Sequence, residues 1–213
     1  MLRIDLYTDI TCPWCLLGQR RLDKVLTERA PKLAVEIHHH PILLLPDAPV
    51  AGLNIADLLR VRHGVTDPKT AFARVEAEAR ASGLDLNLSR QPLVYPTQSA
   101  HAVIHAARER GTQHVLAVAI SEAYFLYARN IADAEVLADI AADHGFDRAE
   151  ALAIALDPDQ LKRIELEAEK SAAAGVRSIP HFVFGGRIAI NGGRNEDEIA
   201  SCMLEAARAT SVD

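Results

Sequence analysis

The pattern that most constrains the fold lies in the first 41 residues. Apolar and polar side chains alternate over residues 2–8, with Leu2, Ile4 and Leu6 on one face, which predicts a β-strand. Residues 13–29 then carry apolar side chains at helical spacing, and residues 33–40 form a second strand pattern that stops at Pro41. Strand, helix and strand in this order predict a β-α-β unit whose two strands run parallel.

Two cysteines stand where the first strand pattern gives way to the helix, in the stretch Cys12-Pro13-Trp14-Cys15. Pro13 falls at the first helical position, where its missing N–H costs nothing. A cysteine at a helix N-terminus gains from the positive end of the helix dipole and from backbone N–H groups that lack an intrahelical partner. Since the thiolate is the nucleophile in disulfide exchange, this placement indicates a redox-active dithiol.

The middle of the chain reads as helices only. No convincing strand pattern occurs between residues 54 and 175, and the first helix signal there is Asp67-Pro68. Further start signals follow, at Thr97, Thr112, Asp133, Asp147 and Asp157. We therefore expect an inserted helical domain over residues 49–174.

Strand patterns return near the C-terminal end. Residues 181–184 and 187–190 form two short strand patterns joined by the turn Gly185-Gly186, and an amphipathic helix pattern covers residues 196–208. This order predicts a β-β-α unit. Residues 1–48 and 175–213 are thus expected to be two halves of one α/β fold, on either side of the inserted helices.

Composition narrows the classes of function. The chain has 213 residues, a formal net charge of −6 and 49% hydrophobic residues, so neither nucleic acid nor an anionic membrane is expected as a partner. No apolar run is long enough to span a bilayer, and the strand pattern begins directly after Met1 without a secretory signal. With only three cysteines, the expected location is the cytoplasm.

The whole chain resembles the DsbA family of the thioredoxin fold, and within it the FrnE-like branch. The resemblance is carried by the segment from Asp9 to Cys15, by residues 128–131 with 136–139, and by the segment from Gly175 to Val183. It implies a thioredoxin fold of β-α-β and β-β-α halves. The chain is also similar in organisation to 2-hydroxychromene-2-carboxylate isomerases and kappa-class glutathione transferases.

The resemblance implies a role for each residue of the dithiol segment. Cys12, the first and more exposed cysteine, would attack a disulfide as a thiolate. Cys15, three residues on and on the same helix face, would resolve the mixed disulfide. Pro13 and Trp14 would set the stiffness and packing between the two cysteines and contact the substrate.

The same resemblance assigns a substrate-binding role to residues 179–181. Pro180 corresponds to the family's cis-proline, which packs against the dithiol, and Ile179 would offer backbone groups to an extended substrate. His181 follows the proline, where an apolar residue is commoner. It is either close to the thiols, where it could favour the thiolate, or a strand-edge histidine that faces solvent.

Other histidines and the third cysteine have less specific signals. A zinc site is disfavoured, because there is no second Cys-x-x-Cys and a strand would place His38 and His40 on one face with His39 on the other. His101 occupies a position that is often histidine in the FrnE-like branch, and it either faces a cleft or packs in the core. Cys202 has the spacing of a small core residue.

Two functional classes lead from these observations. The first is a protein disulfide oxidoreductase whose substrate is a protein or small-molecule thiol or disulfide. It would need no cofactor beyond its redox-active disulfide, with glutathione as a candidate co-substrate. The alternative is a glutathione-dependent isomerase or transferase, although such enzymes generally have serine where Cys12 stands. A non-catalytic binding module is a third class that the sequence allows. The sequence is compatible with a monomer and with a homodimer.

Overall fold

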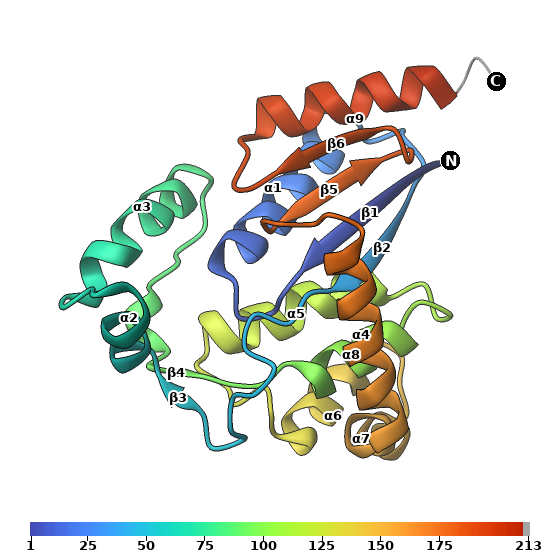
Figure 1. Ribbon diagram of the computed structural model, residues 1–213. Coiled ribbons are helices and arrows are strands. Elements are labelled where there is room, and N and C mark those ends of the chain that lie inside the picture. Colours follow the sequence, from blue (N-terminus) through green and yellow to red (C-terminus); the bar gives the residue numbers. More distant parts are fainter. Residues whose placement is uncertain (211–213) are drawn as a thin grey trace.

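The computed structural model describes residues 1–210 and brings both ends of the chain into one sheet (Figure 1). The strand order is β2-β1-β5-β6, with β2 parallel to β1 and the other pairs antiparallel. The strands are β1 (Leu2–Thr8), β2 (Val35–Pro41), β5 (His181–Phe184) and β6 (Ile188–Asn191). The β-α-β and β-β-α predictions are therefore confirmed, and residues 211–213 of the expected C-terminal half lie outside the described residues.

The helices are α1 (Pro13–Glu28), α2 (Ile55–His63), α3 (Pro68–Ala81), α4 (Gln98–Ala106), α5 (Gln113–Phe125), α6 (Ala134–Ala142), α7 (Arg148–Leu156), α8 (Pro158–Ala173) and α9 (Glu196–Thr210), with a short 3₁₀ helix at Leu88–Arg90. Figure 1 shows α2 and α3 standing apart at the left, and α4 to α8 gathered below the sheet. Within residues 1–210, every helix falls short of the length and apolar character that a membrane span requires.

Two apolar cores meet at α1. Leu22 and Val25 pack with the sheet residues Ile4 and Phe182 and with α9, so α1 and α9 cover the same face of the sheet. One to two turns earlier, Leu16 and its neighbour Leu17 belong to the larger core of the helical region. The N-terminal end of α1, which carries the two cysteines, therefore lies at the junction of the two cores.

The expectation of helices alone between residues 54 and 175 is wrong in one detail. A two-stranded ladder pairs β3 (Leu53–Asn54) with β4 (Leu93–Val94). Two-residue strands are too short to show the alternation that predicts a strand. Helix α2 also precedes the first helix signal at Asp67. Its apolar stripe, Ile55, Leu58 and Leu59, spans little more than one turn and is only partly buried, so the helical pattern is short.

Candidate active site

Cys12 is the N-cap residue of α1, and its extended backbone (φ −92°, ψ 111°) turns the chain from β1 into the helix. Its carbonyl oxygen accepts hydrogen bonds from the N–H groups of Cys15 (2.9 Å) and Leu16 (3.3 Å). Its own N–H donates to the carbonyl of Asp9 at 3.2 Å. Pro13 is the first helical residue, as predicted, so the cysteine side chains lie in the first turn of the helix.

The two thiols differ in accessibility. Cys12 is 7% exposed and Cys15 is fully buried, and both are free cysteines. Burial raises the pKa of the Cys15 thiol well above its usual value, and the neighbouring Cys12 side chain raises it further. Cys15 is therefore held as a neutral thiol, while only Cys12 can be reached from solvent.

Pro180 packs against the helix that carries the dithiol. The bond between Ile179 and Pro180 is cis. A Cβ added at Gly18, three residues beyond Cys15, would come within 3.0 Å of Pro180 Cγ, so the absence of a side chain there lets the proline ring approach α1. Within the described residues, the backbone groups of Ile179 make no hydrogen bond to the main chain.

The Trp14 ring is enclosed between two parts of the chain that are distant in sequence. A Cβ at Gly193 would lie 2.2 Å from Trp14 Cε3, so the indole rests directly on this backbone. On α3, Arg74 places its guanidinium carbon 5.5 Å from the centroid of the ring. Trp14 thus connects the dithiol with both α3 and the loop before α9.

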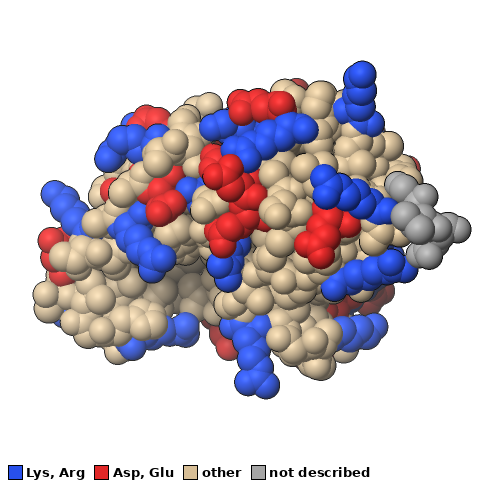
Figure 2. All heavy atoms as spheres, turned by 90° about the horizontal axis from the view of Figure 1, so that it is seen from above, with Lys and Arg blue, Asp and Glu red and all other residues tan. Residues whose placement is uncertain are grey.

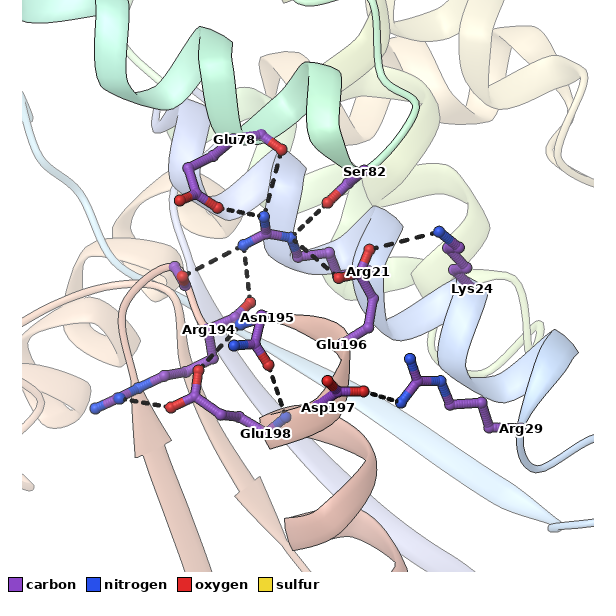
Figure 3. A network of polar contacts seen from close by, with 11 residues as sticks. Arg21, Lys24, Arg29, Glu78, Ser82, Arg194, Asn195, Glu196, Asp197 and Glu198 are labelled. Carbon is purple, nitrogen blue, oxygen red and sulfur yellow. Dashed lines mark hydrogen bonds and ion pairs between the residues drawn. The ribbon is translucent and has the colours of Figure 1, made fainter.

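Arg21 fixes that loop and α3 from the next turns of α1 (Figure 3). The Arg21 side chain is 3% exposed, and its Nη1 donates to the carbonyls of Gly193 (3.3 Å) and Arg194 (3.0 Å). Its Nε donates to Ser82 Oγ, and Nη2 donates to the Glu78 carbonyl and, at 2.6 Å, to Glu78 Oε2. Each of the five N–H donors of Arg21 therefore has an acceptor. One of these acceptors is the carbonyl of Gly193, the residue on which the Trp14 ring rests.

A buried acid and a buried histidine lie on the other side of the dithiol. Asp9 is 1% exposed, and its Oδ2 accepts the N–H of Leu44 at 2.7 Å. His101 of α4 is also buried, and its Nε2 is 3.8 Å from Asp9 Oδ1, too far for a hydrogen bond. His101 therefore packs in the interior beside the acid that precedes Cys12.

The three consecutive histidines of β2 divide between the two faces of the sheet, as the strand pattern predicted. His39 is buried, and its Nε2 lies 2.9 Å from Nδ1 of His114, which in turn reaches Asp23 at 2.7 Å. On the other face, His40 hydrogen-bonds Asp5 at 2.7 Å. Among residues 1–210, no three His, Cys, Asp or Glu side chains are grouped as a metal site would require.

His181 does not lie at an edge of the sheet, because β5 is an inner strand. Its ring is half-buried and tilted against Tyr7, with centroids 5.4 Å apart, and its Nδ1 contacts Asn191 Oδ1. The expectation of a strand-edge histidine is therefore wrong. Cys202 is partly buried against the core of the sheet.

Sequence reasoning did not select Asp9, Arg21, Arg74 or Gly193 as site residues. Asp9 had a signal, because it is the first residue of the segment from Asp9 to Cys15 that carries the family resemblance. Arg21 had none, since it follows Arg20 on what reads as the polar face of a helix. The partners that bury Arg21 are 57 to 173 residues away, so no local pattern records them.

Comparison with known proteins agrees with this arrangement. The family of DSBA-like thioredoxin domains matches residues 3–203, so the chain belongs to this family. An uncharacterized protein of Bacillus subtilis, YwbO, is 25% identical over 190 residues, which cover 85% of this chain and 86% of that protein. The predicted thioredoxin fold of the DsbA family is thereby confirmed.

Two solved structures share the fold over nearly their whole length. A probable DsbA oxidoreductase from Streptomyces coelicolor superposes with a TM-score of 0.84 at 24% identity, covering 98% of this chain and 91% of that one. The cytosolic disulfide reductase DsbM from Pseudomonas aeruginosa, in a structure with glutathione, gives a TM-score of 0.69 at 17% identity, with coverage of 97% and 99%. At these identities the likeness concerns the fold.

Proposed function

We propose that this protein is a thiol–disulfide oxidoreductase that acts through Cys12 and Cys15. The observation that carries the proposal is the pairing of a reachable thiol at the helix N-cap with a fully buried thiol three residues on. A resolving cysteine is useful only if a disulfide forms during the reaction. The rival isomerase or transferase chemistry needs no second thiol at this place.

The reaction we propose has two exchange steps. The Cys12 thiolate attacks one sulfur of the substrate disulfide, so that a mixed disulfide forms and the other substrate sulfur leaves as a thiolate. Cys15 then gives up its proton and attacks the Cys12 sulfur, which forms the Cys12–Cys15 disulfide and releases the second substrate thiolate. The substrate gains two electrons and the dithiol loses two. Two molecules of a small thiol such as glutathione regenerate the dithiol: the first opens the Cys12–Cys15 disulfide to a mixed disulfide, and the second attacks this mixed disulfide, so that the two leave as their own disulfide.

Residues 179–181 would hold the substrate beside Cys12. The main-chain groups of Ile179, which have no main-chain partner in the described residues, are available to an extended substrate. Pro180 lies against the first turns of α1 and limits the approach to the dithiol to one side. His181 would support this segment through its contacts with Tyr7 and Asn191 rather than through the thiols.

Single cysteine variants test the proposal. With hydroxyethyl disulfide as substrate and glutathione as reductant, we expect Cys12→Ser to abolish exchange. Cys15→Ser should accumulate a mixed disulfide that mass spectrometry detects on Cys12. Cys202→Ser is the matched control, because Cys202 lies on α9, partly buried against the core of the sheet, and it should retain full activity.

Exchange that survives in Cys12→Ser would sink the proposal. Saturable glutathione binding by the wild type with no redox turnover would favour the isomerase or transferase alternative instead. The direction of electron flow follows from the reduction potential of the dithiol. A potential near that of DsbA, about −120 mV, would make the protein an oxidant. A potential near that of thioredoxin, about −270 mV, would make it a reductant.

We also propose that the protein works in the cytoplasm. Three cysteines with a single close pair are typical of proteins in a reducing compartment. Fractionation of cells that express a tagged form would test this location.

A further inference from the structure

An apolar cavity of about 190 Å³ opens beside Cys12. Thr11 and Pro13, the two neighbours of Cys12 in the chain, form part of its wall. The opposite wall comes from α2 and α3, the elements that stand apart in Figure 1. Figure 2 shows the surface hollowed between the lobe at the left and the rest of the molecule. Cys12 itself is not part of the wall, but the residues on both sides of it are, so a group bonded to the Cys12 sulfur would lie close to this cavity.

The wall of the cavity offers almost no hydrogen bonds. Apart from Thr11, the polar side chains that line it are Gln91 and Tyr124, and both are engaged inside the protein. The Tyr124 hydroxyl donates to the Leu93 carbonyl at 3.0 Å, and Gln91 Nε2 donates to the Tyr124 carbonyl at 3.2 Å. Gln91 Oε1 accepts the N–H of Leu93. A polar ligand would lose its own hydrogen bonds here without compensation.

Shape and size restrict the ligand further. Three of the twelve residues in the wall are aromatic, namely Phe72, Tyr124 and Phe125, and most of the others are aliphatic. An apolar cavity of about 150 Å³ is known to stay dry and to bind benzene. The cavity beside Cys12, at about 190 Å³, is large enough for one six-membered ring with a short arm.

We propose that this cavity is the binding subsite for a single apolar ring attached by a short chain to the reacting sulfur of the substrate. The preferred substrate is then a disulfide of a small arylalkyl thiol. This inference rests on the proposed exchange reaction, since the ring arrives on the sulfur that bonds to Cys12. Because Gln91 and Tyr124 are already engaged inside the protein, the cavity takes the ring and leaves the rest of the substrate outside.

Helix α2 offers a variant that fills the cavity without touching the dithiol. Leu58 lines the cavity and is only partly buried, so a larger side chain there can extend into the cavity. We expect Leu58→Trp to occupy the space of the ring. Val61, on the same helix, is 79% exposed and is not part of the wall, which makes Val61→Trp the matched control.

Exchange rates with methyl phenylpropyl disulfide and methyl propyl disulfide test the proposal, because both release alkanethiols of similar reactivity. The wild type should prefer the phenyl compound by about tenfold in kcat/KM, as expected for the burial of one ring. Val61→Trp should keep this preference, and in Leu58→Trp the ratio should fall to about one. Since the ratio compares two substrates within one variant, a general loss of activity cancels. Equal rates in the wild type would overturn the proposal.

Propylbenzene, which has no sulfur, tests the cavity without the reaction. Calorimetric titration should show saturable binding to the wild type and to Val61→Trp, and none to Leu58→Trp. If propylbenzene binds but neither disulfide reacts, the proposed oxidoreductase activity fails and the cavity stands. If the disulfides react at equal rates and propylbenzene does not bind, the activity stands and the cavity proposal fails.

A second pair of substrates identifies the source of the ring. Mixed disulfides of methanethiol with the dipeptides Cys-Phe and Cys-Ala present a ring on a peptide instead of on a small thiol. Equal rates for this pair, together with a preference for the phenylpropyl compound, assign the site to a small thiol. A matching preference for Cys-Phe would overturn that assignment in favour of a peptide side chain.

Discussion

Gln19 and Arg21 lie two residues apart on α1 and are both buried, with exposed fractions of 1% and 3%. Arg21 has an acceptor for each of its five N–H groups. Among the described residues, neither amide atom of Gln19 has a hydrogen-bond partner. The contrast teaches that depth of burial does not tell whether a polar side chain stabilises a fold. What decides is whether its hydrogen bonds are satisfied.

The two residues also face different parts of the protein. Arg21 holds α3 and the loop before α9 together on one side of the dithiol helix (Figure 3). Cys15, Gln19 and Asp23 follow one another at four-residue spacing, so they share the other face. Asp23, which is partly exposed, begins the partly buried contact to His114 and His39 on that side. On one face of α1 the hydrogen bonds of Arg21 are thus all satisfied, whereas the other face is a partly buried polar stripe in which the Gln19 amide has no partner.

The largest effect on stability should come from removing the hydrogen bonds of Arg21. Arg21→Met leaves the Glu78 carboxylate and the carbonyls of Gly193 and Arg194 without their donor. We expect the free energy of unfolding to fall by about 2–4 kcal/mol in denaturant titration, because several acceptors lose a buried, charged hydrogen-bond donor, while the Glu78 carboxylate itself is 45% exposed and can be hydrated. Arg20→Met is the control. Its partner Glu122 is 3.4 Å away and its side chain is 47% exposed, so the loss should stay below about 1 kcal/mol. Equal losses would contradict the contrast between the two positions.

A smaller effect on stability is expected at Gly193, the residue on which the Trp14 ring rests. In Gly193→Ala the new Cβ would lie 2.2 Å from the indole, so ring or loop must move, at a cost of about 1–3 kcal/mol. Trp14 is the single tryptophan of the chain, so its fluorescence should change as well. Gly83→Ala is a control, because that glycine has positive φ but open space around its Cβ position. It should lose stability through backbone strain and keep the wild-type emission, and a spectrum altered equally in both variants would contradict the placement of Trp14.

On the polar side, acid should weaken the fold through His39. Burial lowers the pKa of His39 well below its usual value, and the nearby His114 lowers it further. The unfolded chain therefore binds a proton near pH 6.5 that the folded protein does not, so stability is complete above that pH and falls as the pH is lowered. One such group removes about 1.4 kcal/mol per pH unit once the pH is below 6.5. His39→Gln should reduce the slope of unfolding free energy between pH 6.5 and 5.5 by about 1 kcal/mol, and an unchanged slope would count against a neutral buried His39.

The sequence predicted what depends on local pattern. Alternation and helical spacing are properties of neighbours, so the β-α-β start, the helix beginning at Pro13 and the β-β-α end were all accessible, and the paired cysteines pointed to the site. The hydrogen-bond network of Arg21 could not be predicted, because its acceptors come from α3 and from the loop before α9. The cavity beside Cys12 was equally hidden, since its wall combines Phe72, Tyr124 and other residues from separate elements. The apolar stripe of helix α2 consists only of Ile55, Leu58 and Leu59, which is too short to predict a helix securely.

The smallest effect, and the sharpest test of the contrast, is expected at Gln19. Replacing a buried amide that lacks partners by an apolar side chain of similar size removes a desolvation cost and loses no hydrogen bond. Gln19→Leu should therefore leave the free energy of unfolding within about 1 kcal/mol of the wild type, or raise it, although the residue is buried more deeply than Arg21. Denaturant titration of Gln19→Leu beside Arg21→Met makes the comparison directly. A loss of about 2 kcal/mol or more would mean that the amide is hydrogen-bonded in solution. Gln19 would then stabilise the fold through hydrogen bonds, as Arg21 does, and the buried amide behind Cys15 would not lower the stability of the protein.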